Sequence, residues 1–570
     1  VLNLNAPIRS GGGNFTLTGS GISTVNVGNG GNSDNTGIIG QGVTLASTGG
    51  TVNLASGTFT DPATININKD LTLNGTSGTT VSGAGNKQVF NISGGTVNLN
   101  SLTITGGSTS GSGGGVFIGS GATVTISNST ISGNTANNGG GLYNTGSLSV
   151  SDSTISGNSA TSNGGGLYNN GSVGITSSTL SGNSALSAGG GILNDLGSIS
   201  ISNSTLSGNS AGIGGGILNY LGSVGISNSS ISGNSVANSG GGIWNNGSVG
   251  ISNSTLSGNS ATSGGGMLNR GSVSLSNSTL SGNMAGYGGG IANFTGSVSM
   301  SGSSISGNSA TYGGGMINYQ GSVSISNSTL SSNLANSGGG ILNVGSLSLS
   351  SSSLSGNSAA SSGGGILNVG NLSLSSSSLS GNSAANSGGG IWNSGSVSMS
   401  SSTLSGNSAL SGGGMLNTGS VAISGSTLSG NSAGINGGGG IWNRGSLSIS
   451  NSSLSGNSAF NGGGILNYLG SVSITSSTLS GNTAANLGGG IWNSGSVDLT
   501  SSSLSGNIAQ ANGGGIYNRG SLTLSFSTIT LNTASIRGGG IFNFTGFTAV
   551  LTSSTVSGNT AGVQGNDIFP

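Results

Sequence analysis

Residues 388–410 read GGGIWNSGSVSMSSSTLSGNSAL, and variants of this segment recur along most of the chain. A Gly-Gly-Gly triplet followed by an apolar residue begins eighteen times, first at Gly113 and last at Gly538, at intervals of 24 to 26 residues. A fixed period of this length is typical of a solenoid, in which each repeat is one structural unit stacked on the next.

Three short segments of the unit predict β-strands: residues 391–393, 397–400 and 404–407. Apolar and small polar residues alternate in them, as in a strand with one buried face, and no helical period of 3.6 is present. The unit is too short for a propeller blade and lacks a leucine-rich frame. We therefore predict an all-β fold, a single long parallel β-helix with about 25 residues and three short strands per coil.

Stacking places equivalent residues of successive coils above one another. Small hydroxyl residues are expected to face outward, as at Ser396, Ser398 and Ser400. The inward columns are expected to contain Ile391, Val397, Met399, Leu404, Ala409 and their equivalents.

Two asparagine columns run almost unbroken through the repeats. Stacked amides can hydrogen-bond along the axis as a ladder, and Asn also tolerates left-handed backbone at a corner. A catalytic amide would be a single residue, whereas these are columns, which favours a structural role. The predicted ladder residues include Asn144, Asn169, Asn194, Asn245, Asn393, Asn443 and Asn493 in one column, and Asn183, Asn209, Asn308, Asn407 and Asn457 in the other.

All four tryptophans share one column, between the inward aliphatic residue and the first ladder asparagine. Alternation along the strand directs this column outward. Three roles stay open: covering a groove beside the neighbouring loop, lateral contact between molecules, or stacking on a ligand. The residues are Trp244, Trp392, Trp442 and Trp492.

Composition excludes several kinds of chemistry. Among 570 residues there are no His or Cys, seven Lys and Arg, and seven acidic residues, all Asp. The usual ligands for zinc and haem and the usual catalytic triads are therefore missing, and we predict no enzymatic activity, cofactor or metal site. A net charge of zero and the lack of a long apolar run argue against nucleic-acid binding and a membrane span. The one acidic and basic cluster, Asp61, Lys69 and Asp70, is interpreted as a solvated turn or local ion pair.

Four regions are predicted: an N-terminal extension or donor-strand-like segment over 1–35, irregular opening coils over 36–112, regular repeats over 113–547, and a degenerate terminal coil over 548–570. No charged or helical cap is recognisable at either end, which leaves strand edges open to another chain. Because the chain starts at Val1, we expect secretion after removal of a signal peptide. The expected assembly ends are Val1, Leu2, Leu4, Phe544, Phe547 and Phe569.

The unit resembles the repeats of chlamydial polymorphic outer-membrane proteins and related bacterial surface proteins and autotransporter passengers. Those carry paired Gly-Gly-Ala-aliphatic and Phe-x-x-Asn motifs. Here Gly-Gly-Gly-Ile takes the place of the first, and residues 404–407, with Leu in place of Phe, take the place of the second. The resemblance implies a right-handed β-helix located extracellularly or at the cell surface.

Two functions follow from these features. The leading hypothesis is the structural subunit of an extracellular bacterial fibre, a homopolymer assembled head to tail through its uncapped ends. The alternative is a monomeric adhesin or passenger-like domain that binds glycan or matrix. Ice binding ranks lower, because Ser rather than paired Thr dominates the outer face.

Overall fold

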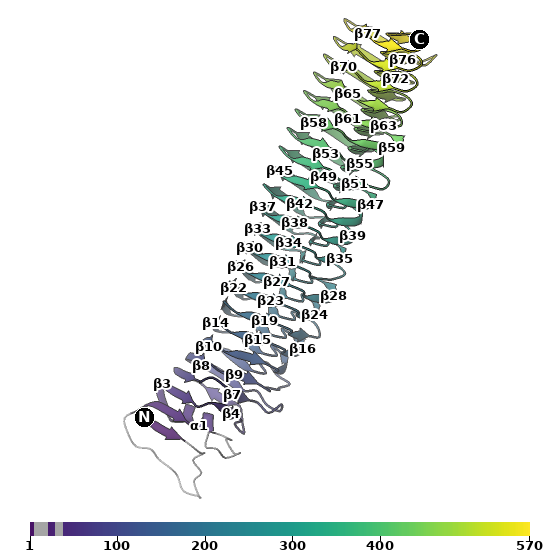
Figure 1. Cartoon of the computed structure of the whole chain (residues 1–570). Coiled ribbons are helices and arrows are strands. Elements are labelled where there is room, and N and C mark those ends of the chain that lie inside the picture. Colours follow the sequence, from purple (N-terminus) through teal and green to yellow (C-terminus); the bar gives the residue numbers. More distant parts are fainter. Residues whose placement is uncertain (5–20, 29–37, 570) are drawn as a thin grey trace. The chain divides into compact units, whose positions relative to one another are not determined.

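The computed structural model describes residues 1–4, 21–28 and 38–569, whose regular secondary structure is almost entirely β-strand (Figure 1). The chain divides into two compact units, residues 1–279 and 280–570. Within each unit the strands pair in parallel with their equivalents one coil later, which confirms the predicted parallel β-solenoid. The predicted N-terminal extension, 1–35, lies largely outside the described residues.

One coil of unit 2 represents the repeat. It contains β52 (Ile391–Asn393), β53 (Ser396–Ser400), β54 (Thr403–Ser405) and β55 (Ser408–Ser411). The first two strands belong to one sheet, and β54 and β55 belong to a second and a third sheet. Each predicted segment thus overlaps one of the first three strands, and β55 is a fourth strand that the sequence analysis did not predict.

Neighbouring coils are held in register by parallel ladders. Strand β53 pairs with β49 (Asn371–Ser375) on one side and β57 (Ser420–Ser424) on the other, which places Val397 between Leu372 and Val421. In unit 1, β14 (Ser147–Ser151) pairs with β18 (Ser172–Thr176) in the same way. The result is a set of apolar columns along the interior of each unit. Of the predicted inward residues, Ile391, Val397, Met399 and Leu404 are buried and Ala409 is half-buried.

Left-handed backbone turns the chain at three corners of the coil, at Ser401 (φ 47°), Gly406 (φ 62°) and Gly388 (φ 63°). The ladder asparagines are not among these residues, so the expectation that they occupy left-handed corners is wrong; Gly406 makes that turn immediately before Asn407. The second and third triplet glycines are required by close backbone approach. A Cβ on Gly390 would lie 2.6 Å from the carbonyl oxygen of Gly414 in the next coil.

A helix, α1 (Ile38–Leu45), packs against the first strands of unit 1, β2 (Ile22–Val27) and β3 (Ala46–Leu54). Ile38 and Ile39, the first two residues of the helix, are fully buried. Gly42 allows the close approach, because a Cβ there would lie 3.1 Å from Val27 Cγ2 and 3.2 Å from Val52 Cγ1. The prediction that neither end carries a helical cap is therefore wrong at the N-terminal end.

Two charged side chains hold α1 in place. Asp61, which is 5% exposed, accepts hydrogen bonds from the backbone amides of Ile39 (3.2 Å) and Gly40 (2.6 Å) at the helix N-terminus. Lys69 Nζ donates to backbone carbonyls at the other end of the helix, including that of Thr44 at 3.4 Å. Both contacts complement the helix dipole. The interpretation of this cluster as a solvated turn is therefore wrong for Asp61, whose side chain is buried against the helix N-terminus.

Candidate interaction surfaces

The first asparagine column forms a continuous amide ladder within each unit. Asn393 Nδ2 donates to Asn417 Oδ1 at 2.8 Å and to the carbonyl of Gly395 at 3.1 Å, while its Oδ1 accepts from Asn368 Nδ2 at 2.8 Å. Its side chain is fully buried. These amides also donate to backbone carbonyls of the turn between the two strands of the first sheet.

The second asparagine column joins coils more densely. Asn407 Oδ1 accepts from the backbone amide (2.9 Å) and the Nδ2 (3.0 Å) of Asn382, and its Nδ2 donates to Asn431 Oδ1 and the carbonyl of Leu379, both at 3.0 Å. Each side chain therefore bonds to the coil before and the coil after it. Every predicted ladder residue donates its Nδ2 to the next asparagine at 2.8 to 3.0 Å: Asn144, Asn169, Asn194, Asn245, Asn393, Asn443, Asn493, Asn183, Asn209, Asn308, Asn407 and Asn457.

A buried serine ladder was missed by the sequence analysis. Ser402 Oγ accepts from the backbone amide of Ser377 in the preceding coil at 3.0 Å and donates to the carbonyl of Ser400 at 2.7 Å. Equivalent serines are buried in both units, for example Ser153 in unit 1 and Ser303 in unit 2. The signal was present as an unbroken serine column after the left-handed corner, but it was hidden among outward-facing serines.

The tryptophan column is more covered than alternation alone implies. Trp244 is 9% exposed, and Trp392, Trp442 and Trp492 are half-buried. The column runs beside the glycine-triplet corner: a Cβ on Gly240 would lie 2.7 Å from Trp244 Cβ. Aromatic residues from adjacent coils stack along this column, with ring centroids 4.8 to 5.4 Å apart for Phe117, Tyr143 and Tyr168, and 5.1 to 6.3 Å apart for Trp492, Tyr517 and Phe542.

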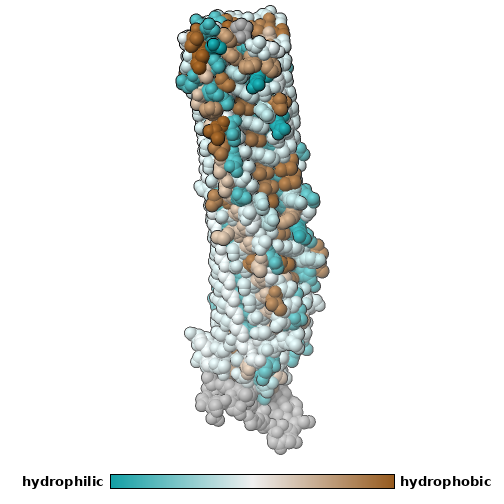
Figure 2. Space-filling model, turned by 90° about the vertical axis from the view of Figure 1, so that its right-hand side faces the viewer, coloured by the Kyte–Doolittle hydropathy of each residue, from teal (hydrophilic) through white to brown (hydrophobic). Residues whose placement is uncertain are grey.

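A groove opens over this column in unit 2. Its floor is formed by Trp442, Leu466 and Trp492 of three successive coils, and Asn461 and Tyr468 line it as well. Figure 2 shows the side of the molecule that carries the third-sheet strands such as β59 (Ser432–Gly437) and β63 (Ser458–Ala459), where apolar side chains are interspersed among hydrophilic ones. Two tryptophans and a tyrosine therefore line this groove.

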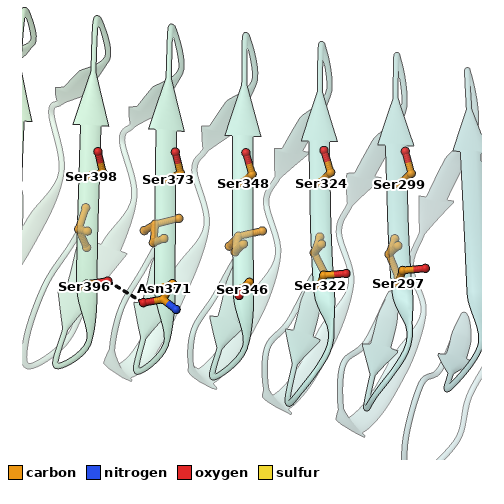
Figure 3. A pocket seen from close by; sticks show the side chains of 15 residues that line it. Ser297, Ser299, Ser322, Ser324, Ser346, Ser348, Asn371, Ser373, Ser396 and Ser398 are labelled. Atoms are coloured by element: carbon orange, nitrogen blue, oxygen red, sulfur yellow. Dashed lines mark hydrogen bonds between the residues drawn. The ribbon is translucent and has the colours of Figure 1, made fainter.

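A second groove of unit 2 is lined by serine hydroxyls and by Val and Leu side chains. It follows five strands from β37 (Ser297–Ser301) to β53, and Figure 3 shows two labelled rows of polar side chains with an apolar row between them. Ser396 Oγ donates to Asn371 Oδ1 at 2.7 Å. No charged residue lines this groove. The predicted uncharged, hydroxyl-rich outer face is confirmed here.

The carboxylates of the described residues are dispersed. Asp152 sits at a left-handed corner (φ 49°), and Asp70 Oδ1 accepts the backbone amide of Thr96 at 2.7 Å. Tyr168 Oη donates to Asp195 Oδ2 at 2.9 Å; burial, together with this carboxylate, raises the pKa of Tyr168 well above its usual value. Within the described part of the chain, no three acidic side chains gather into a metal-binding group.

The N-terminal strand pairs within its own chain. Strand β1 (Leu2–Leu4) runs parallel to β2, with Leu2 beside Val25. Leu4 is buried in the interior of unit 1, Leu2 is half-buried and Val1 is 86% exposed.

The last coil of unit 2 exposes its inward column. Leu551 of β77 (Thr548–Thr552) is 37% exposed and Ile568 of β80 (Ile568–Phe569) is 42% exposed, although both continue apolar columns that are buried in the preceding coil. Phe569 stacks on Phe542 at 5.2 Å. Phe544 and Phe547 lie next to each other on the surface, with ring centroids 6.2 Å apart.

The second asparagine ladder ends at Asp567. Its Oδ1 accepts from the backbone amide (3.1 Å) and the Nδ2 (3.0 Å) of Asn559, as the next asparagine would. An ionised carboxylate has no donor to pass on. The amide ladder therefore stops at this residue.

No helix among the described residues is long and apolar enough to cross a membrane. Two segments, residues 152–170 and 501–519, match the Chlamydia polymorphic membrane protein repeat, which confirms the resemblance of the repeat unit. No curated protein matches. Among solved structures, the PL6 family alginate lyase AlyGC is similar at 13% identity over 93% of this chain and 99% of that chain, with a TM-score of 0.21. A mutant of the same lyase gives 11% identity over the same shares, also with a TM-score of 0.21.

Proposed function

We propose that this chain is a non-catalytic structural domain of a bacterial cell-surface protein, comparable to an autotransporter passenger. The observation that carries the proposal is that its buried polar side chains make structural hydrogen bonds. The buried asparagine and serine columns bond coil to coil, and Asp61 and Asp567 serve the helix cap and the ladder end. The match to polymorphic membrane protein repeats supports a surface location.

Surface labelling tests this role. Antibodies raised against the purified chain are expected to label intact, unpermeabilised cells of the source bacterium, and external protease is expected to remove the label. A periplasmic reporter protein that stays unlabelled is the control for cell integrity. Labelling that requires permeabilisation would refute the surface location.

Head-to-tail assembly is a second candidate, favoured by the exposed inward side chains Leu551 and Ile568 of the last coil. The strand edges and apolar columns there would stack on β1 of another copy, the strand whose outer edge is left by its pairing with β2. Because α1 covers apolar residues near the N-terminal end, the contact would have to form along the edge of β1.

Sedimentation velocity over a hundredfold concentration range tests assembly. We expect the wild-type chain to form longer particles as concentration rises, and Ile568→Asp to remain monomeric because it places a charge in the apolar contact. The matched control is Ser398→Asp on the outer face. A wild-type chain that sediments as a monomer at every concentration would rule out this assembly.

A further inference from the structure

We propose that the groove over Trp442, Leu466 and Trp492 of unit 2 binds a neutral saccharide. The proposal deepens the surface role, and it rests on that role only in that a surface domain meets extracellular glycans. The site is argued from the aromatic floor, the amides that line it, its lack of charge, and the contrast with a covered tryptophan in unit 1.

The third sheet is irregular where the groove opens. The coil that starts at Gly412 is 26 residues long and the coil that starts at Gly438 is 24 residues long. Strand β59 carries the extra length, and its pairing with β55 shifts register between Ala409 and Ser411. Gly437 takes a left-handed conformation (φ 82°) at the end of this longer strand. The longer strand is followed by β63, which has only two residues, so the third sheet changes length at the groove.

Aromatic rings form the apolar surface of the groove. The rings of Trp442 and Tyr468 stack with centroids 6.1 Å apart and an angle of 21° between their planes. Leu466 separates Trp442 from Trp492 in the column. The half-buried rings of Trp442 and Trp492 lie on strands of a hydrogen-bonded sheet and are therefore rigid, so they bind the apolar face of a ring-shaped ligand at a small cost in conformational entropy.

Two asparagines supply polar groups beside this floor. Asn461 Oδ1 accepts hydrogen bonds from Asn486 Nδ2 (3.1 Å) and the Leu487 backbone amide (3.2 Å), and no partner for its own Nδ2 is found among the described residues. The exposed side chain of Asn436 likewise makes no hydrogen bond within the described part of the chain. Amides that can both donate and accept match sugar hydroxyls, which also do both.

The absence of charged side chains in the groove disfavours ionic ligands. Its lining contains no charged side chain. An anionic sugar or phosphate would lose hydration on entering without gaining a cationic partner. Peptides with charged groups would meet the same penalty. A neutral saccharide, which combines an apolar ring face with hydroxyl groups, is the ligand class that this lining fits.

Trp244 of unit 1 provides an internal comparison. It lies beside Leu268, as Trp442 lies beside Leu466. The turn residue that follows the ladder asparagine is Arg270 there and Tyr468 in unit 2. The Arg270 guanidinium lies 5.9 Å from the centre of the Trp244 ring, so the chain's own cation occupies that ring.

Isothermal titration calorimetry of the full chain tests the proposal with three probes: cellotetraose, N-acetylated chitotetraose and tetragalacturonate. We expect at least one neutral probe to bind with a Kd below about 1 mM, in the range of a small, partly polar site. Trp442→Leu is expected to weaken that binding at least tenfold, and its fold is expected to persist because leucine fills the same column at Leu416 and Leu466. Trp244→Leu is the matched control and should change affinity less than twofold.

Three outcomes would overturn the proposal. One is the absence of heat from both neutral probes at millimolar concentration. Another is an equal loss of binding in Trp442→Leu and Trp244→Leu, which would place the ligand elsewhere. The third is tighter binding of tetragalacturonate, which would assign the surface to an anionic ligand. None of these outcomes bears on surface labelling, so failure of this site and failure of the proposed function are distinguishable.

Discussion

The regular coils and the N-terminal helix α1 satisfy their buried polar groups with hydrogen bonds in different ways. In the coils, Asn407 is one rung of a column, and its partners Asn382 and Asn431 are the same residue in the same environment. At the cap, Asp61 and Lys69 bond to the backbone of α1, and these contacts do not recur from coil to coil in the described repeats. A column distributes the hydrogen bonds of a buried amide over adjacent coils, whereas the cap depends on single side chains. The two designs therefore predict different responses to substitution.

The largest effect is expected inside a column. Asn407→Ala would remove four buried hydrogen bonds: those that its Oδ1 accepts from the backbone amide and the Nδ2 of Asn382, and those that its Nδ2 donates to Asn431 Oδ1 and the carbonyl of Leu379. We expect the local free energy of unfolding to fall by about 3–5 kcal/mol, since each lost bond costs about 1 kcal/mol and the Asn382 backbone amide, left buried without this acceptor, costs about 1–3 kcal/mol. Hydrogen exchange over residues 378–432 measures the change.

The outward-facing Ser398→Ala is the control for that measurement, with an expected change within about 0.5 kcal/mol. Protection should be lost in the coils on both sides of Asn407, because its side chain bonds to both. If Asn407→Ala and Ser398→Ala exchanged alike, the ladder would contribute nothing to stability.

A smaller and more confined effect is expected at the cap. Asp61→Ala removes the acceptor for two amides of α1, and loss of a helix cap costs about 1–2 kcal/mol. Exchange should rise over residues 38–54 and stay unchanged in the repeats. Asp61→Asn keeps one oxygen acceptor and should lose less. Equal losses in both variants would mean that the carboxylate acts by charge alone.

The same contrast explains what the sequence could predict. Recurrence places Ile391, Leu404 and the ladder asparagines in columns, so the repeat fold and its amide ladders could be inferred without a structure. Helix α1 could not, because its eight residues include two glycines and it depends on packing against β2 and β3. The groove over Trp442 was equally hidden, since it arises from the irregular third sheet and from which turn residue follows.

The serine column tests whether a side chain with one inter-coil hydrogen bond contributes less stability than a ladder asparagine. Ser402→Ala leaves the Ser377 backbone amide without its acceptor, but it removes only one inter-coil bond. We expect a loss of about 1 kcal/mol, the usual net value of one hydrogen bond. Chemical unfolding followed by tryptophan fluorescence measures it, and Ser398→Ala, whose side chain is exposed, is the control. A loss as large as that of Asn407→Ala would contradict the ranking.

The smallest effect on stability is expected at Tyr168, which makes a single side-chain hydrogen bond within the repeats. This effect depends on pH. Burial, followed by the hydrogen bond to Asp195, raises the pKa of Tyr168 in the folded chain, while the unfolded chain keeps a value near 10. The unfolded state therefore releases this proton first, and stability that is complete below about pH 10 is lost as the pH rises further. Urea unfolding at about pH 9 and pH 11 should show a smaller alkaline loss for Tyr168→Phe than for the wild type. Asp195→Asn keeps an acceptor without the charge and should fall between them; an alkaline loss that is identical in all three chains would show that this pair does not govern the response.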